Sequence, residues 1–416
     1  MAEWKEYTVA DVISTVIDYR GKTPKKLGGD WSDSGYRALS AKNIKTGKIV
    51  QPDSIRYVAE DMYRCWMKDE VQKEDILITS EAPFGQIYYW DSDEKIVLSQ
   101  RLFAVRINQQ FYPKYIYFYM TSSFFQAELD GRATGTTVVG LRQPELLKCK
   151  IFAPDYQEQK RMADTLWCLE QKINNNEAIN NNLLEQIRTI CTAWLSDYEP
   201  FDGVMPSDWV ETPLSDIAEF ISGYSYKGTE LTDSTIAMAT IKNFDRKGGF
   251  KLDGYKDIIP SSKLKESQHA ELFDTLVAHT DLTQNAEVIG NAEPVMSKSG
   301  YDDIVFSMDL VKVLPKKDSV SKFLIAAILQ DKKFKAHCLG YINGTTVLHL
   351  SKKALPEYKL FLPSDLSTLK PLDEVVTALY KQVSSNISEN TYLEELRESL
   401  LPKLMSGELD VSTLEF

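Results

Sequence analysis

The sequence contains little of what a metal site, a disulfide framework or a membrane anchor requires. Its five cysteines and four histidines are scattered over 416 residues, with no CxxC pair and no cluster of the two residue types. We therefore expect no bound metal, and reduced, structural thiols in a cytoplasmic protein. No stretch approaches the roughly 18 uninterrupted apolar residues of a transmembrane helix. The opening residues, MAEWKEYTVADV, do not resemble a signal peptide.

Motifs of catalytic machinery are also missing. There is no GxxxxGK[ST] loop, no glycine-rich strand–turn–helix signature for a cofactor, and no Asn/Asp-Pro-Pro-aromatic motif to hold a flipped adenine. Pro154-Asp155 with Glu158 and Lys160 superficially resembles a PD–ExK nuclease motif, but this spacing puts Glu158 in the first turn of a helix. The segment 279–281 (HTD) is better explained as a polar loop than as a metal or acid–base site. We expect no catalytic residue and no cofactor in this chain.

The charge is unevenly distributed along the sequence. The whole chain carries −12, yet residues 1–154 hold 21 Lys+Arg against 20 Asp+Glu, so the acidity lies in the rest. Phosphate contacts need Lys and Arg, so the overall balance argues against a simple DNA-binding protein. Binding to DNA at this balance requires local basic loops, with partner subunits holding most of the phosphate backbone.

The chain contains an internal repeat, which is its strongest signal. GTTVVGL at 135–141 recurs as GTTVLHL at 344–350, 209 positions later. The same offset relates two further pairs, which follow in the same order. These are KCKIFAP at 148–154 with EYKLFLP at 357–363, which pairs Pro154 with Pro363, and LLEQIR at 183–188 with YLEELR at 392–397. A period this long excludes a solenoid and indicates a tandem duplication of a whole domain.

The earlier parts of the two halves match in the same order at slightly different offsets. These matches pair Trp4 with Trp209, AKNI at 41–44 with IKNF at 241–244, DILIT at 75–79 with DTLVA at 274–278, and SQRLFAV at 99–105 with SMDLVKV at 307–313. The drift in offset indicates loops gained and lost around a retained framework. Each copy has short β-branched and aromatic runs, followed by one long helix.

The helix of the first copy is predicted to begin after Asp155, which resembles an N-cap with Glu158 three residues on, and to run to about Leu195. Apolar residues spaced by four and three predict a coiled-coil seam, interrupted by Asn176 and Asn180. The second copy starts near Pro371 and also has a polar middle, SSNISEN at 384–390. If the helices pair antiparallel, the polar layers meet. Either the asparagines are buried in the seam or they face solvent, and both leave the helices paired.

With these motifs the chain resembles the specificity (S) subunits of Type I restriction–modification systems over essentially its whole length. The resemblance is carried by the ordered series WKEYTVADV and WVETPLSDI, YRGKTP at 19–24, DILIT, the GTT segments, IFAPDYQEQ at 151–159 and SLLPKLMSGEL at 399–409. The second junction departs from the pattern, because FLPSDLS stands where the EQ pair is expected.

The resemblance implies an α+β fold in which two tandem mixed α/β target-recognition domains are separated by two long antiparallel coiled-coil helices, as a pseudo-twofold internal repeat. The predicted division is into residues 1–154 and 200–363 as recognition domains, and 155–199 and 364–416 as helical spacers. It further implies that each recognition domain reads one half of a bipartite site in double-stranded DNA. The helices would set the gap and hold two methyltransferase (modification) subunits, which bind S-adenosylmethionine. Restriction subunits would join the full complex.

Candidate DNA-contacting residues lie in loops beside the predicted strands. They are Arg20, Lys22, Thr23, Lys25, Lys26, Lys42, Asn43, Thr79, Ser80, Thr136, Thr137, Tyr226, Lys227, Lys242, Asn243, Thr345 and Thr346. The lysine–asparagine pairs suit a phosphate and an adenine edge, although the asparagines equally suit turn caps. The GTT segments suit phosphate contacts or a structural turn. Residues that read bases should differ between the halves, which favours Thr79-Ser80-Glu81 and Tyr226-Lys227.

Two other classes of function compete with DNA recognition. A pseudo-symmetric assembly scaffold without direct DNA reading accounts better for the acidity, but poorly for the divergence of the loops. A duplicated enzyme would need paired catalytic motifs, which the sequence lacks.

Overall fold

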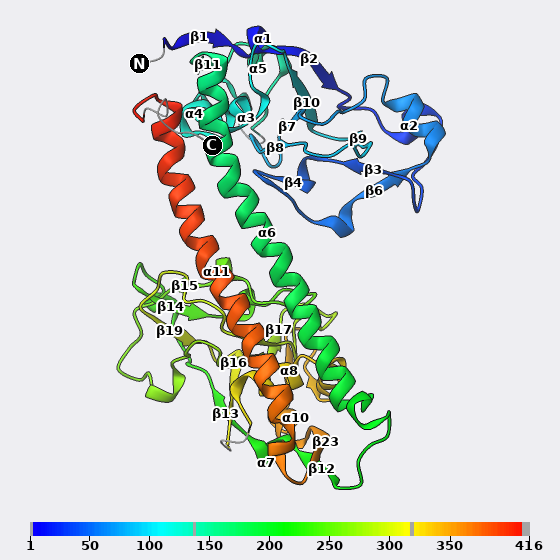
Figure 1. Ribbon diagram of the computed structural model, residues 1–416, viewed down its shortest axis with the longest axis vertical. Coiled ribbons are helices and arrows are strands. Elements are labelled where there is room, and N and C mark those ends of the chain that lie inside the picture. Colours follow the sequence, from blue (N-terminus) through cyan, green and yellow to red (C-terminus); the bar gives the residue numbers. More distant parts are fainter. Residues whose placement is uncertain (1–2, 136–138, 317–319, 410–416) are drawn as a thin grey trace. The chain divides into compact units, whose positions relative to one another are not determined.

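The computed structural model describes residues 3–135, 139–316 and 320–409, and it divides into two compact units. Unit 1 comprises Met1–Lys172 with Leu393–Phe416, and unit 2 comprises Ile173–Tyr392. The long helices α6 (Tyr156–Leu195) and α11 (Lys370–Met405) each contribute a segment to both units (Figure 1). Among the described residues, no helix combines the length and the apolar character needed to cross a bilayer.

The described residues of unit 1 form four small sheets. A ladder pairs β1 (Lys5–Thr8) with β11 (Lys150–Ala153), and a hairpin joins β4 (Ile44–Lys45) to β5 (Lys48–Ile49). The antiparallel four-stranded sheet has the order β2 (Ile13–Asp18), β10 (Leu102–Ile107), β7 (Ile76–Thr79), β8 (Ile87–Tyr89). The three-stranded sheet has the order β6 (Arg56–Val58), β3 (Tyr36–Leu39), β9 (Val97–Leu98), with β9 parallel to β3. Its shorter helices are α1 (Val9–Val12), α2 (Glu60–Trp66), α3 (Pro113–Thr121), α4 (Ser123–Arg132) and α5 (Gln143–Leu146).

Unit 2 repeats this order of elements. Its ladder pairs β12 (Trp209–Pro213) with β23 (Lys359–Pro363). Its four-stranded sheet runs β13 (Ala218–Ser222), β20 (Leu310–Pro315), β16 (Thr275–Ala278), β18 (Ala292–Pro294), and a three-stranded sheet runs β15 (Lys256–Asp257), β14 (Ile236–Ala239), β19 (Asp303–Phe306). A further sheet runs β17 (Thr280–Asp281), β22 (Leu348–Leu350), β21 (Ile342–Asn343). The helices are α7 (Leu214–Ile217), α8 (Lys322–Leu329), α9 (Lys332–Leu339) and α10 (Ala354–Glu357). Three sheets with matching strand orders are what a tandem duplication predicts.

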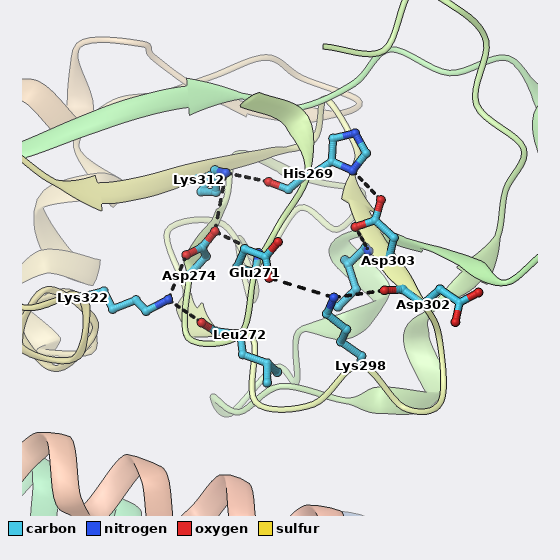
Figure 2. A network of polar contacts seen from close by, with 10 residues as sticks. His269, Glu271, Leu272, Asp274, Lys298, Asp302, Asp303, Lys312 and Lys322 are labelled. Atoms are coloured by element: carbon cyan, nitrogen blue, oxygen red, sulfur yellow. Dashed lines mark hydrogen bonds and ion pairs between the residues drawn. The ribbon is translucent and has the colours of Figure 1, made fainter. Parts of the chain in front are cut away.

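A buried aspartate at the start of a central strand recurs in both units. Asp75 and Asp274 each follow a residue in the left-handed backbone region, and each accepts a bond from the backbone N–H three residues earlier, at 2.8 and 3.0 Å. The cations that neutralise them come from different places. Arg106 makes two bonds to Asp75, of 2.9 and 2.8 Å. Asp274 lies between two lysine ammonium groups, which belong to Lys312 and Lys322, at 3.5 Å from each (Figure 2).

The two predicted long helices are confirmed, and their polar middle is buried in unit 2. There, Asn176 and Asn180 of α6 lie opposite Asn390 and Asn386 of α11, joined by amide hydrogen bonds of 2.8 Å. Asn176 pairs with Asn390, whereas the later Asn180 pairs with the earlier Asn386, so the two helices are antiparallel here. All four side chains are at most 9% exposed, so the asparagines do not face solvent. At the start of α6, Asp155 accepts the N–H of Glu158 at 3.0 Å, as the predicted N-cap requires.

Candidate nucleic-acid interface

A polar cleft of about 810 Å³ opens in unit 1 where four segments meet. The segments are the loop after β2, the end of β7, the turn before β10 and the segment that precedes α5. The cleft is lined by four cations, two carboxylates and two amides, which belong to Arg20, Lys26, Arg101 and Arg142, to Asp18 and Glu81, and to Gln100 and Gln143. Four of the residues predicted from the sequence line it, namely Arg20, Thr23, Lys26 and Ser80. The cationic side chains of this hollow can bind phosphates, and the amides beside them can hydrogen-bond to base edges. The lining therefore suits a nucleic acid.

Arg20 holds the loop after β2 in place. Its guanidinium forms an ion pair with Asp18 at 2.6 Å, donates to the carbonyl of Leu141 at 3.1 Å, and lies 4.8 Å from the centre of the Phe103 ring. Because this side chain is only about a quarter exposed, most of its donors are engaged within the protein. Arg20 therefore positions one wall of the cleft.

The rest of this loop carries lysines at its surface. Thr23 caps a short 3₁₀ turn by accepting the N–H of Lys26 at 3.3 Å, and the Lys26 ammonium donates to Gly21 at 2.7 Å. Lys22 lies over the Tyr19 ring at 4.3 Å, whereas Lys25 is exposed. The loop thus presents Lys25 and Lys26 to solvent, as a phosphate contact requires.

A smaller recess of about 180 Å³ shares Gln100 and Arg101 with the main cleft. Lys42 lines it, together with Arg56, whose guanidinium lies 4.7 Å from the centre of the Trp31 ring. An arginine stacked on an aromatic ring keeps its donor edge free in the plane, so Arg56 adds to the cationic surface.

Asn43 and Asn243, which the sequence assigned either to adenine edges or to turns, are turn residues. Asn43 is 1% exposed; its Oδ1 accepts the N–H of Ser40 at 3.1 Å and its Nδ2 donates to Ser54 at 2.9 Å. Asn243 is 0% exposed and bonds Thr240 and Lys251 in the same way. Both amides are used inside the protein, which favours the turn-cap alternative over base reading.

Thr79 is also placed unfavourably for a DNA contact. It is the buried last residue of β7, and its Oγ1 accepts the N–H of Gln86 at 2.8 Å. Ser80 follows with 3% exposure, and Glu81 forms an ion pair with Arg101 at 2.9 Å. Among these three neighbours, Glu81 has the most accessible side chain.

In unit 2 the predicted residues fall in different places. Lys242 lines a cleft of about 360 Å³ with Arg246, Lys251 and the exposed Leu282. Tyr226 and Lys227 belong to another loop. Thr345 and Thr346 are exposed, and their carbonyls accept bonds from Gln284. Thr136 and Thr137 lie outside the described residues.

The sequence did not single out Arg101 and Arg142, which line the main cleft of unit 1, or Arg56, which lines the smaller recess. Arg101 is one of four positions that differ between the segments SQRLFAV and SMDLVKV, and it is the one at which the charge is reversed. Arg142 and Arg56 had no such signal, since only the fold brings Arg142 to the cleft and Arg56 to the recess. Within the described residues, no three His, Cys, Asp or Glu side chains gather as metal ligands. The segment 279–281, predicted to be a polar loop, instead contains the buried strand β17 (Thr280–Asp281), which pairs with β22. The cysteines are free, with Cys65 and Cys168 exposed rather than structural.

Comparison with known proteins shows which proteins this chain is similar to. Residues 1–185 match the family model of the Type I restriction modification DNA specificity domain. The chain is 22% identical to the Type I restriction enzyme MjaIX specificity subunit of Methanocaldococcus jannaschii, covering 94% of this chain and 87% of that one. It is 21% identical to the HindI specificity subunit of Haemophilus influenzae, covering 98% and 100%. The resemblance to Type I specificity subunits is confirmed.

A solved structure of a Type I specificity subunit shares the fold. The S subunit from M. genitalium superimposes with a TM-score of 0.57 at 16% identity, covering 97% of this chain and 96% of that chain. The family-model match spans all of the segments that form the unit 1 cleft, together with the first part of α6. The cleft thus lies in the part of the chain that carries the specificity-domain signature.

Proposed function

We propose that this chain is the DNA sequence-recognition subunit of a Type I restriction–modification complex and contributes no catalytic step. Each unit would read one half of a bipartite site in double-stranded DNA. The main support for the proposal is that the two units share the same arrangement of sheets but carry different side chains at their clefts. The units share three sheet orders, yet the unit 1 cleft presents Arg101 and Arg142, whereas the unit 2 cleft presents Arg246 and Lys251. Two different half-sites require this combination of common framework and divergent loops.

The acidic balance of the chain is compatible with such a role if partners hold most of the phosphates. Two methyltransferase subunits would be docked by this chain, and S-adenosylmethionine would be bound by them. Restriction subunits would join this assembly. The chain itself supplies recognition and a scaffold.

Two copies of one partner need two equivalent docking surfaces, and the duplicated ladders offer a candidate pair. Phe152 in β11 and Phe361 in β23 occupy matching positions and are 40% and 41% exposed. Each stands beside an ion pair across its ladder, between Lys150 and Glu6 in one unit and between Lys359 and Glu211 in the other. Exposed apolar residues on the long helices, Ile179, Val375 and Tyr392, extend the apolar surface available to partners.

The long helices would set the gap between the half-sites. A helix of 40 residues such as α6 measures roughly 60 Å at 1.5 Å per residue. Half-sites read from one face of the duplex should be about 10 bp apart, centre to centre.

Sequencing of methylated adenines in the native genome, with and without this gene, tests the proposal. We expect a gapped, two-part methylated motif that disappears with the gene. Exchange of residues 1–154 for those of a relative should then alter only one part of the motif. An unchanged methylome, with a methyltransferase still captured by the tagged chain, would support the scaffold function instead.

A further inference from the structure

Arg101 and Asp309 occupy the same position in the two copies of the framework. The carbonyl of Arg101 accepts the N–H of Ser80 at 2.8 Å, and the carbonyl of Asp309 accepts the N–H of His279 at the same distance. The next link in the backbone network is also shared, because the carbonyls of Ser80 and His279 each accept an N–H from a leucine, at 2.9 and 2.8 Å. The equivalence therefore rests on hydrogen bonding as well as on sequence order.

The side chains at this shared position have opposite charges. Arg101 pairs with Glu81 at 2.9 Å, whereas Asp309 accepts the hydroxyl of Thr280 at 3.0 Å. Glu81 and Thr280 are themselves equivalent, since they follow Ser80 and His279. A framework role would preserve the charge in both copies, as it preserves the aspartates Asp75 and Asp274. Divergence here matches what reading of different half-sites requires.

The location of Arg101 points to a ligand. Its side chain is 49% exposed and lines both the main cleft and the smaller recess. Its backbone has a φ of +62°, a conformation that non-glycine residues adopt at a cost. Such strain concentrates at functional sites, where it aims a side chain. In unit 2 the neighbouring Met308 is 58% exposed, so this turn is also accessible there.

Only certain groups on DNA can attract these two side chains. An arginine fork donates to the O6 and N7 acceptors of guanine in the major groove, and a carboxylate accepts from the N4 amino group of cytosine. Phosphates repel a carboxylate, so Asp309 has a favourable partner only on a base edge. A phosphate contact therefore cannot account for the carboxylate of Asp309 at this position.

We propose, building on the function proposed above, that Arg101 and Asp309 are specificity-determining residues at equivalent positions of the two half-sites. Arg101 reads a guanine in one half-site, and Asp309 reads a cytosine in the other. The ion pair with Glu81 holds Arg101 at the edge of the unit 1 cleft, and the hydroxyl of Thr280 holds the partly exposed carboxylate of Asp309.

The test uses the full chain expressed with its partner methyltransferase in cells free of other adenine methylation, and sequencing of the methylome. Arg101→Ala should lower the preference for guanine at one position of one half-site by about 10- to 100-fold, the range expected for a bidentate contact. The other half-site should be unchanged. Asp309→Ala should relax one cytosine position of the opposite half-site. Alanine adds no backbone strain at Arg101, because both residues carry a Cβ.

A double variant, Glu81→Thr with Arg101→Asp, installs the unit 2 pair in unit 1 and should shift the preferred base at that position from guanine to cytosine. Arg64→Ala, an exposed arginine on α2 paired with Glu60, is the matched control and should leave the motif intact. Unfolding midpoints of all variants verify folding. A uniform fall in methylation with an unchanged motif, or changes in both half-sites, would overturn the inference while leaving the proposed function in place. A wild-type methylome without a two-part motif would instead overturn the proposed function.

Discussion

The Asn176 amide on helix α6 donates a hydrogen bond of 2.8 Å to the Oδ1 of Asn390 on helix α11. The same Asn176 amide donates to Glu389 at 2.7 Å, and Asn390 in turn donates to the carbonyl of Ile173 at 3.2 Å. The side chains of Asn176, Asn390 and Glu389 and the carbonyl of Ile173 therefore all have hydrogen-bond partners inside unit 2. Buried asparagines in a helix seam cost stability but fix the register of the pair, because a shift would leave them without partners.

Breaking one side of this pair should therefore be worse than replacing both. We expect Asn390→Leu to lower the free energy of unfolding by about 1–3 kcal/mol, the cost of a buried amide without its partner. The double variant Asn176→Leu with Asn390→Leu should recover much of that loss. Urea denaturation of the two variants, with the exposed Asn175→Leu as control, measures the difference. If the losses in unfolding free energy caused by the two substitutions simply added in the double variant, the two amides would not be coupled.

The ion pair between Arg106 and Asp75 should be among the strongest single contributions to unit 1. Asp75 is 0% exposed and its carboxylate receives both arms of the guanidinium, while Arg106 also donates to the carbonyl of Glu70 at 2.9 Å. Arg106→Leu should cost about 3–5 kcal/mol, because it leaves a buried charge uncompensated. Arg64→Ala removes an exposed ion pair and should cost less than about 1 kcal/mol. Denaturation curves recorded side by side test this contrast.

Glu293 should make the stability of unit 2 depend on pH. Burial raises the pKa of this carboxyl to about 7 from its ordinary 4.5, although the Gly249 N–H, the charge of Arg188 and a bond from Gln330 act to lower it. Between these two values the folded state holds a proton that the unfolded state has lost. The stability contributed by this group is therefore fully present below pH 4.5 and falls as pH rises through 7.

Glu293→Gln should consequently gain stability relative to wild type as the pH is raised from 5.5 to 8, by about 1–3 kcal/mol. Urea midpoints of the wild type and the variant at both pH values give the answer. If the midpoints of the wild type and the variant changed equally between the two pH values, Glu293 would be ionised throughout this range. The effect should be confined to the transition of unit 2, because Gly249, Gln330 and Arg188 all belong to it.

The features that were predictable from the sequence are those encoded by periodicity and order. The repeat, the long helices and the asparagines between their apolar runs follow from spacing alone, since seam positions recur at fixed intervals. Strand-to-strand pairing was not readable, because β9 and β19 meet their neighbours only through long-range contacts. Recurring motifs proved to be framework, as the buried Asn43 and Asn243 illustrate.

Site residues were harder to predict because the cleft is assembled from four separated segments. Thr79 resembled an accessible strand end, but every residue of β7 is buried and its hydroxyl is used locally. Arg142 and Arg56 reach their recesses only through the fold. The strand-flanking loop with Arg20, Thr23 and Lys26 was predicted because it is basic and contains glycine, and the charge reversal at Arg101 was a further signal in the sequence.

Substitution of Asn43 should affect folding, whereas substitution of its neighbour Lys42 should affect DNA binding. Asn43→Ala removes five hydrogen bonds of a side chain that is 1% exposed and should lower the free energy of unfolding by about 1–3 kcal/mol. Lys42→Ala changes an exposed side chain and should leave stability within about 0.5 kcal/mol. In the assembled complex, Lys42→Ala should weaken DNA binding about equally for all sequences. A base-specific effect of Lys42→Ala would contradict its assignment to phosphate.

Arg142 offers the most direct test that the unit 1 cleft meets the phosphate backbone. It is exposed, lines the cleft, and stands where unit 2 has Ser351, so its charge serves one half only. A cation that neutralises one phosphate releases counterions, and the slope of log K against log salt changes by about 0.9 for each. Arg142→Ala in the assembled complex should flatten that slope by about one and weaken binding most at low salt. Titrations of a labelled duplex at several salt concentrations measure it, with Arg64→Ala as the control of equal charge. An unchanged slope would show that Arg142 does not contact a phosphate, even if affinity fell, because a loss independent of salt cannot come from a phosphate contact.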